Sequence, residues 1–206
     1  MASSSARSRM SSQVTETGVW RVSDESRNLT IFDLDGTLAE MWETELLPGV
    51  AERVAELDGP FAVATNQAGV AWNAGKGDPY PRPSEVGRRL VDVAEALPAL
   101  QDALWLVSIG DERVSLPPQR WRALAAGVTQ AATPLRVRTS SDLDWRKPRP
   151  GMLLEACRTF GVSPADALFV GDRPEDTEAA EAAGMPFVYA IRFFGREEQG
   201  RADRTQ

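Results

Sequence analysis

Two aspartates separated by one residue, Asp33 and Asp35, follow a short apolar run and constrain this chain more than any other feature. The run at residues 29–32 is partly β-branched and predicts a buried strand, and Gly36 allows a tight turn where that strand ends. Both carboxylates can then turn toward one site above the sheet edge. Two carboxylates that lie close together repel each other unless a proton or a cation lies between them. The pair therefore predicts a Mg²⁺ site that carries a nucleophile, with an ordinary surface turn as the alternative.

Apolar and amphipathic segments alternate along the rest of the chain. This pattern predicts an α/β fold, in which a three-layer, Rossmann-like arrangement places helices on both faces of a central parallel sheet. The Gly- and Pro-rich residues 70–83 are expected to form an irregular loop. The expected strands are residues 29–34, 61–64, 104–109, 135–139, 167–170 and 187–190, and the expected helices are 48–58, 84–97, 119–130, 151–160 and 174–183.

The length of 206 residues fits one folded domain, which we place at residues 28–194. Residues 1–27 are Ser-rich and polar and are expected to be disordered, and residues 195–206 are expected to form a charged, flexible tail. The N-terminus shows no signal-peptide pattern and no apolar run is long enough to span a membrane. We expect a monomer without a membrane partner.

Composition excludes several kinds of chemistry. The chain has no histidine, which removes His-containing triads, His general bases and His-ligated zinc. Its single cysteine, Cys157, excludes a disulfide framework and favours the cytoplasm. The net charge of −7 argues against broad electrostatic capture of nucleic acid. Nearly all basic residues are arginine, so the lysines Lys76 and Lys147 mark places where a compact ammonium is useful.

Four chemical stretches are expected at one edge of the sheet, because ligands of parallel sheets bind outside the carboxyl ends of the strands. Their order along the chain resembles that of the haloacid dehalogenase superfamily of phosphotransferases, and the resemblance covers about residues 29–190. The four stretches are Asp33 with Asp35, Thr65-Asn66, Lys147, and Gly171-Asp172 followed by Asp176.

The resemblance implies roles for the two aspartates. Asp33 would be the nucleophile that attacks phosphorus and forms an aspartyl-phosphate. Asp35 would act as general acid toward the leaving oxygen and then as general base toward water, while its backbone carbonyl binds Mg²⁺. An Asp at this second position marks phosphatases and phosphomutases in the superfamily.

The other stretches would bind phosphate and metal. Thr65 and the backbone N–H groups around Asn66 would donate to phosphoryl oxygens, and Lys147 would hold nucleophile and phosphate together by its charge. Asp172 would complete the Mg²⁺ site with Asp33 and Asp35. Asp176 would position Lys147 or a metal-bound water, and the neighbouring Arg146 is a further candidate for substrate binding.

The stretches at residues 65–70 and 146–152 resemble the branch that contains histidinol-phosphatase, heptose-bisphosphate phosphatase and polynucleotide 3′-phosphatases. The zinc loop usual in the first two is absent, because the chain lacks the Cys and His residues to build it. The spacing between motifs also leaves no room for a large cap domain, so the site is expected to be open.

Three functions are therefore compatible with the sequence. We predict a Mg²⁺-dependent phosphomonoesterase acting on a small phosphorylated metabolite such as a sugar phosphate. A nucleic-acid 3′-phosphatase is the alternative, in which tryptophans would stack on a base. A receiver-like phospho-acceptor domain is a minor alternative, since such domains share the α/β order but lack the Asp-x-Asp-Gly-Thr motif. The tryptophans considered for stacking are Trp72, Trp105, Trp121 and Trp145, of which Trp105 lies inside an expected strand.

Overall fold

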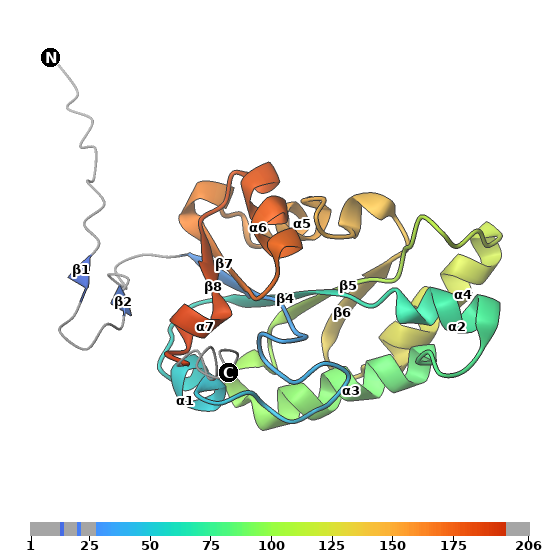
Figure 1. Cartoon of the computed structure of the whole chain (residues 1–206), viewed down its shortest axis with the longest axis horizontal. Coiled ribbons are helices and arrows are strands. Elements are labelled where there is room, and N and C mark those ends of the chain that lie inside the picture. Colours follow the sequence, from blue (N-terminus) through green and yellow to red (C-terminus); the bar gives the residue numbers. More distant parts are fainter. Residues whose placement is uncertain (1–12, 15–19, 22–27, 197–206) are drawn as a thin grey trace, which may run out of the picture.

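The computed structural model describes residues 13–14, 20–21 and 28–196 of the chain. Its centre is a six-stranded parallel sheet with the order β6-β5-β4-β3-β7-β8 (Figure 1). A separate antiparallel pair, β1 and β2, lies near the N-terminus. The strands are β1 Gln13–Val14, β2 Trp20–Arg21, β3 Leu29–Phe32, β4 Phe61–Asn66, β5 Leu104–Ser108, β6 Arg136–Ser140, β7 Ala167–Gly171 and β8 Phe187–Tyr189.

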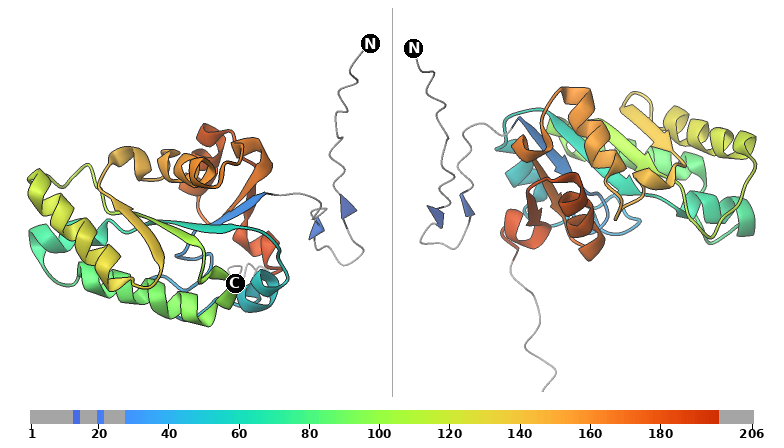
Figure 2. Two further views of the ribbon diagram at one scale, coloured as in Figure 1. Left: turned by 180° about the vertical axis from the view of Figure 1, so that it is seen from behind. Right: turned by 90° about the horizontal axis from the view of Figure 1, so that it is seen from above.

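Side-chain alternation along the strands builds two apolar layers, one on each face of the sheet. In β3, for example, Phe32 packs into one layer while Leu29 and Ile31 pack into the other. Helices α1, α3, α4 and α7 cover the first face, and α5 and α6 cover the second (Figures 1 and 2). The helices are α1 Val50–Ala55, α2 Gly69–Lys76, α3 Pro83–Ala96, α4 Pro118–Ala131, α5 Gly151–Phe160, α6 Pro174–Ala183 and α7 Ala190–Phe193.

The predicted fold class is confirmed, and each expected strand of the main sheet is present with ends that differ by one or two residues. Most of residues 1–27 and of the tail 195–206, predicted to be disordered and flexible, lie outside the described residues. Within the described part of the chain, no helix has the length and apolar character needed to cross a bilayer.

The expectation of an irregular loop over residues 70–83 is wrong for its first half. Residues Gly69–Lys76 form helix α2, whose buried side chains include Val70 and Ala71. The run from Val70 to Ala74 has neither glycine nor proline, and every proline of the stretch follows residue 78. Helix α2 ends at Lys76, the following Gly77 has a φ of +76° that suits glycine, and the irregular part of the stretch comes after the helix.

The parallel topology brings the four chemical stretches to one edge. Strands β3, β4 and β7 are neighbours in the centre of the sheet, so the residues after them share the same end. Residues 33–60 contain only α1 besides a long loop, and residues 67–135 supply the short helix α2 together with α3, β5 and α4, which belong to the sheet and one of its helical layers. In the described residues no separate folded unit covers this edge.

Close packing between α3 and α4 generates a stability prediction. A Cβ at Gly87 would lie 2.5 Å from the carbonyl oxygen of Val128 and 2.6 Å from Cβ of Ala131. Overpacking of this kind costs about 1–3 kcal/mol, and the upper part of this range applies because the nearest atom is a backbone oxygen that cannot rotate away. After the gain of about 1 kcal/mol that Ala offers over Gly in a helix is subtracted, we expect Gly87→Ala to lower the free energy of unfolding by about 1–2 kcal/mol in urea denaturation.

Gly75→Ala is the matched control. Gly75 also lies in a helix, but a Cβ there would meet nothing within 4 Å. This substitution should raise the free energy of unfolding by roughly 0.5–1 kcal/mol. Equal stabilisation by both substitutions would contradict the tight α3–α4 contact.

Candidate active site

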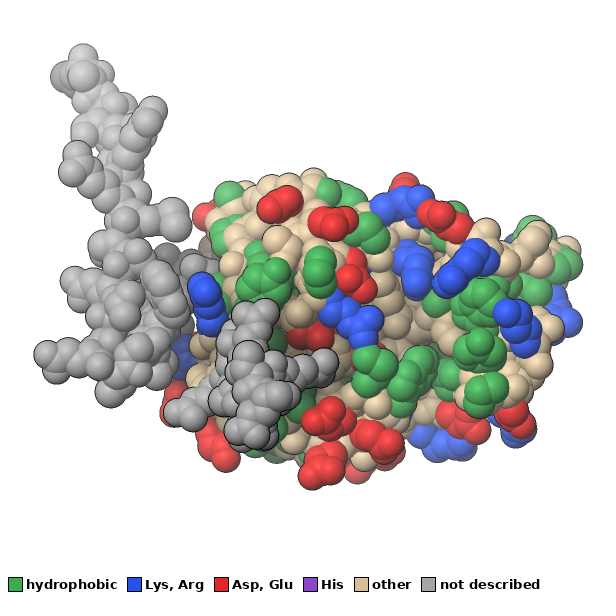
Figure 3. All heavy atoms as spheres, viewed as in Figure 1, with side chains coloured by type: hydrophobic (Ala, Val, Ile, Leu, Met, Phe, Trp, Pro, Cys, Tyr) green, Lys and Arg blue, Asp and Glu red, His purple; other side chains and the backbone are tan. Residues whose placement is uncertain are grey.

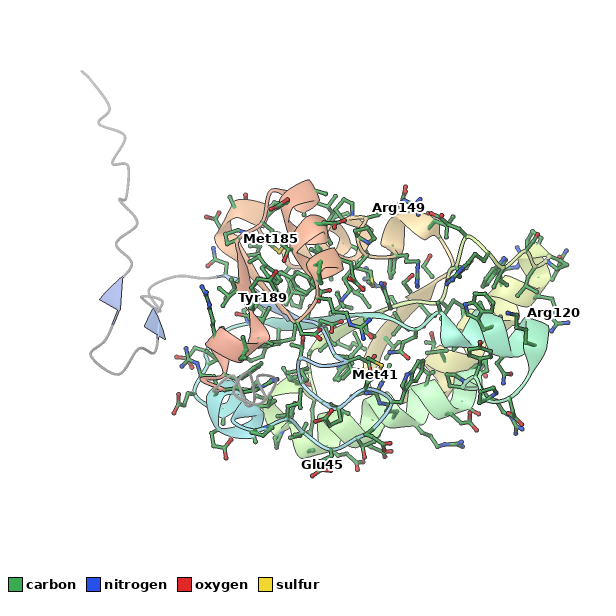
Figure 4. The ribbon with its side chains drawn as sticks, in the orientation of Figure 1. Met41, Glu45, Arg120, Arg149, Met185 and Tyr189 are labelled. Atoms are coloured by element: carbon green, nitrogen blue, oxygen red, sulfur yellow. The ribbon has the colours of Figure 1, made fainter. Side chains whose placement is uncertain are left out.

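A cavity of about 100 Å³ opens where β3 and β4 end. Six of the eight residues predicted for the site line it, and a loop after β3 forms part of its wall (Figure 4, where Met41 of this loop is labelled). The predicted residues in the wall are Asp33, Asp35, Thr65, Asn66, Lys147 and Asp176, and the wall is completed by Met41, Trp42, Arg173 and Glu175.

Lys147 is the centre of the charge network. Its Nζ lies 2.5 Å from Oδ1 of Asp33 and 2.7 Å from Oδ1 of Asp176. The three side chains are almost fully buried, with exposed fractions of 3%, 7% and 2%. Burial lowers the pKa of the Lys147 ammonium, but the two carboxylates raise it by more, so its pKa lies above the ordinary value. Lys147 therefore stays protonated and holds Asp33 in place.

Asp33 sits where β3 ends, and its backbone N–H donates to the carbonyl of Val170 in β7 at 2.8 Å. Burial raises the pKa of Asp33 to about 7 against the opposing charge of Lys147, and the nearby Asp176 and Asp35 raise it further. An additional cation nearby would stabilise the ionised form of this carboxylate. The position of Asp33 is thus suited to binding a metal ion, alone or together with a phosphate group.

The residues present fit a magnesium ion. Oxygen atoms of Asp33, Asp172 and Asp176 lie within 4.8 Å of one another. In Asp176, Oδ1 pairs with Lys147, and Oδ2 accepts the backbone N–H groups of Asp172 and Arg173, each at 3.1 Å. Asp33 and Asp172 are therefore the better metal ligands, with Asp176 holding Lys147. Mg²⁺ uses one or two carboxylates and keeps its remaining positions for water and phosphate.

Glycine is required beside Asp172. A Cβ at Gly36 would lie 2.3 Å from Oδ2 of Asp172, and its φ of +81° is strained for other residues. The adjacent Thr37 points its Oγ1 toward Oδ1 of Asp172 at 3.5 Å. From the end of the described chain, Arg196 donates to the carbonyls of Gly36 and Thr37 at 3.4 and 2.5 Å. The turn after Asp35 is therefore fixed from two sides.

Asp35 faces a different set of groups from Asp33. Its Oδ2 accepts from Nε2 of Gln67 at 2.7 Å, and its Oδ1 pairs with Nη2 of Arg89 at 2.8 Å. The backbone N–H of Trp42 also donates to Oδ1, at 3.2 Å. Both aspartates line one cavity, but each has its own cation, Lys147 for Asp33 and Arg89 for Asp35.

Thr65 is connected to Asp35 through Gln67. Nε2 of Gln67 donates to Oγ1 of Thr65 at 2.9 Å as well as to Asp35. Because the Thr65 hydroxyl accepts this bond, its own proton remains available to donate into the cavity. Thr65 is only 1% exposed, so this donor is held in a dry setting where a hydrogen bond to a phosphoryl oxygen is strong.

Asn66 binds the loop that carries Lys147. Its Nδ2 donates to the Lys147 carbonyl at 3.0 Å, and its Oδ1 accepts the Lys147 N–H at 3.1 Å. The side chain of Asn66 thus positions Lys147, whereas the sequence assigned Asn66 to phosphate through its surrounding backbone N–H groups.

Arg146 is not brought to this cavity. It lines a neighbouring cavity of about 350 Å³, together with Arg113 and Arg149, and Lys147 lines both cavities. Its Nη2 lies 3.6 Å from the buried carboxylate of Asp111. Arg146 therefore lies one residue from the site but contributes to a separate surface.

Sequence reasoning missed Gln67, Arg89 and Trp42. Arg89 is 8% exposed and occupies the apolar stripe of α3 with Val86 and Val93. A charged residue at such a position requires a buried partner, and this pattern could have indicated Arg89. No sequence pattern indicates that the partner is Asp35.

Comparisons with known proteins match part of this sequence and its fold. The HAD-hydrolase-like family matches residues 144–190, which include Lys147, Asp172 and Asp176. The solved structure of a HAD-like phosphatase from Mesorhizobium loti superposes with a TM-score of 0.55 at 24% identity, covering 77% of this chain and 69% of that chain. This likeness concerns the fold.

Shorter stretches resemble curated phosphatases. A phosphoglycolate phosphatase of Thiobacillus denitrificans is 52% identical over 48 residues, which are 23% of this chain and 21% of that protein. A D-glycero-β-D-manno-heptose-1,7-bisphosphate 7-phosphatase of Vibrio cholerae is 48% identical over 66 residues, which are 31% of this chain and 35% of that protein. The chain thus spans about a fifth to a third of the length of these relatives. The matched family region and these phosphatase stretches support a hydrolase of the haloacid dehalogenase (HAD) superfamily, and the parallel sheet agrees with this assignment.

Proposed function

We propose that this chain is a Mg²⁺-dependent phosphomonoesterase that acts through an aspartyl-phosphate on Asp33. The observation that carries the proposal is the buried Lys147 ammonium, 2.5 Å from Asp33 and 2.7 Å from Asp176, beside the second carboxylate of Asp172. This arrangement can neutralise a phosphoryl group and direct a carboxylate oxygen at phosphorus. The contacts of Asp35 favour an enzyme over the receiver-like alternative. Its carboxylate is held by Gln67 and Arg89, apart from Lys147, in a position suited to acid–base catalysis.

The residues divide the reaction between them. Asp33 attacks phosphorus and the ester bond to the leaving oxygen breaks, while Asp35 delivers a proton to that oxygen. Thr65 donates to a phosphoryl oxygen, and Lys147 balances the negative charge on phosphate and nucleophile. Asp35 then removes a proton from water, which attacks phosphorus and regenerates Asp33. Mg²⁺ held by Asp33, the Asp35 carbonyl and Asp172 would supply further charge neutralisation.

Gln67 gives the two halves of the site a fixed spacing. It donates to Thr65 and to Asp35 from the same nitrogen atom. The phosphate-binding hydroxyl and the acid–base carboxylate are therefore held relative to each other before substrate binds. Such preorganisation is worth more in a buried site than in water, because no groups need to reorient during the reaction.

A small phosphorylated metabolite such as a sugar phosphate is the proposed substrate. The cavity of about 100 Å³ has room for a phosphoryl group and little more, so the leaving group lies at its mouth. The names of the matched relatives, phosphoglycolate phosphatase and heptose-bisphosphate phosphatase, support a phosphate ester of a small metabolite.

Metal removal tests the proposal directly. Phosphate release from a panel of phosphorylated metabolites should stop after treatment with EDTA and return on addition of Mg²⁺. The reason is that without a metal ion the carboxylates of Asp33 and Asp172 repel the phosphate, and Lys147 alone leaves the combined negative charge insufficiently neutralised. Undiminished release in metal-free buffer would contradict the metal requirement.

Substitution of the two aspartates tests their roles. Asp33→Asn should remove the nucleophile and Asp35→Asn the proton donor, and each should reduce kcat by about 10²-fold or more. Phosphate release is the measurement, with thermal unfolding as a check on the fold. Asp102→Asn, at an exposed aspartate outside the site, is the matched control and should leave kcat unchanged. Near-normal turnover by Asp33→Asn would rule out the covalent route.

A nucleic-acid 3′-phosphatase is the second candidate, favoured by the neighbouring cavity. Arg113, Arg146 and Arg149 line it beside Lys147, although Asp111 and Glu112 partly balance their charge. Basic side chains also gather on the right-hand half of the face shown in Figure 3. This surface could contact additional phosphates of a strand.

Salt dependence separates the two candidates. A strand held by three arginines releases counterions, so KM for a 3′-phosphorylated oligonucleotide should rise about tenfold between roughly 50 and 200 mM salt. KM for a sugar phosphate should change far less over the same range. Negligible turnover of the oligonucleotide at every salt concentration would eliminate the nucleic-acid candidate.

A further inference from the structure

The loop after β3 exposes two large apolar side chains at the mouth of the catalytic cavity. Met41 and Trp42 are 45% and 48% exposed, and both line the cavity wall. None of the four tryptophans considered from the sequence lines this cavity in the described part of the chain. Trp105 is fully buried in β5, and Trp121 and Trp145 pack against the two apolar layers.

The backbone of Trp42 is held in a strained conformation. Its φ of +68° makes it the single non-glycine residue with positive φ among those the structure describes. A bulky residue in this region is disfavoured and persists only where the surroundings fix it. Trp42 is fixed by the bond from its N–H to Asp35, and the loop by Arg89, which donates to the carbonyls of Glu43 and Glu40 at 2.6 and 3.0 Å.

The indole ring is also supported from behind. A Cβ added to Gly69 at the start of α2 would lie 2.9 Å from Cη2 of Trp42 and 2.8 Å from Cδ of Pro81. The edge of the ring therefore rests over a glycine, next to a proline ring. The indole of Trp42 is thus supported along one edge, and about half of the residue is exposed. It therefore offers a preformed flat surface at the mouth of the cavity, where the leaving group would lie.

The charge of the loop restricts what this surface can bind. Glu40, Glu43 and Glu45 flank Trp42 and are exposed. The cation nearest to Met41 in the cavity wall is Arg173, whose Nη2 lies 3.7 Å from Sδ of Met41, and its guanidinium already lies 3.9 and 3.6 Å from the carboxylates of Asp172 and Glu175. A second anionic group on this side of the cavity would therefore meet the negative charge of the loop and compete with these two carboxylates for Arg173. An uncharged, flat group can stack on the indole face without being repelled by the glutamates.

We propose that Met41 and Trp42 form a leaving-group subsite for phosphomonoesters that carry an aromatic ring, such as a nucleobase on the phosphorylated sugar. The proposal rests on the phosphomonoesterase function proposed above and deepens it by naming the class of leaving group. The ring stacks on Trp42 while the phosphoryl group enters the cavity beside Asp33. The strained backbone places the indole where this stacking occurs, and the bond to Asp35 sets its distance from the proton donor.

A matched substrate pair tests the subsite. Thymidine 3′-monophosphate and the 3-phosphate of methyl 2-deoxyriboside differ in the base and share the phosphorylated sugar. We expect the wild-type chain to show at least about a tenfold higher kcat/KM for thymidine 3′-monophosphate, since stacking of one base is worth that much. Trp42→Ala should abolish the preference, mainly by raising KM for the nucleotide, and Trp42→Phe should retain most of it.

Two further variants keep the test decisive. Trp42→Gly removes the ring and relieves the backbone strain, so loss of preference in a protein of undiminished thermal stability identifies the ring as its cause. Leu154→Ala removes a side chain that is 41% exposed on α5, outside the cavity, and should keep the preference. Equal kcat/KM for both substrates in the wild-type chain would overturn the subsite, as would a preference that survives Trp42→Ala.

Binding separates this inference from the proposed reaction. Asp33→Asn protein lacks the nucleophile, so titration calorimetry with Mg²⁺ and each of the two esters reports affinity alone. Tighter binding of the nucleotide that disappears in the Asp33→Asn, Trp42→Ala double variant supports the subsite, even if the wild-type chain hydrolyses neither ester. Equal affinities overturn the subsite and leave the phosphomonoesterase proposal to its own tests.

Discussion

The ammonium of Lys147, buried between Asp33 and Asp176, is the interaction on which the rest of the site depends. Burying one of these charges alone would be strongly unfavourable, because a desolvated charge needs a partner and hydrogen bonds. Here each group supports the others, and Asp176 adds bonds from two backbone N–H groups at the start of α6. In this arrangement two carboxylates face one ammonium, so the cluster carries a net negative charge that a further cation would stabilise.

This charge cluster requires three backbone segments to approach one another closely. The Lys147 loop must approach β4, and Asn66 secures it through two hydrogen bonds. The turn after β3 must approach Asp172 so closely that only glycine fits at position 36. The parallel order of β4, β3 and β7 places these segments side by side. The fold therefore brings together groups that are more than a hundred residues apart in sequence.

Much of this was predictable from the sequence, because each motif stands directly after an apolar run that predicts a strand. The predicted strand ends place Asp33, Thr65 and Asp172 at one edge of the sheet. Helix α2 is not evident from the glycine and proline content of residues 70–83 as a whole, because every proline of this stretch follows the helix. The contacts of Arg89 and Trp42 could not be predicted, because they depend on how a long loop folds over α3.

The two aspartates show why this site uses a lysine beside one carboxylate and an arginine beside the other. In the proposed reaction Asp33 approaches phosphorus, so its cation has to be compact and leave one carboxylate oxygen open, which suits the ammonium of Lys147. Asp35 needs a fixed orientation at the wall, and the broad guanidinium of Arg89 binds its carboxylate and two loop carbonyls at once. The choice of cation thus separates the two carboxylates: the ammonium of Lys147 holds the proposed nucleophile Asp33, and the guanidinium of Arg89 fixes both the proposed proton donor Asp35 and the loop that carries Trp42.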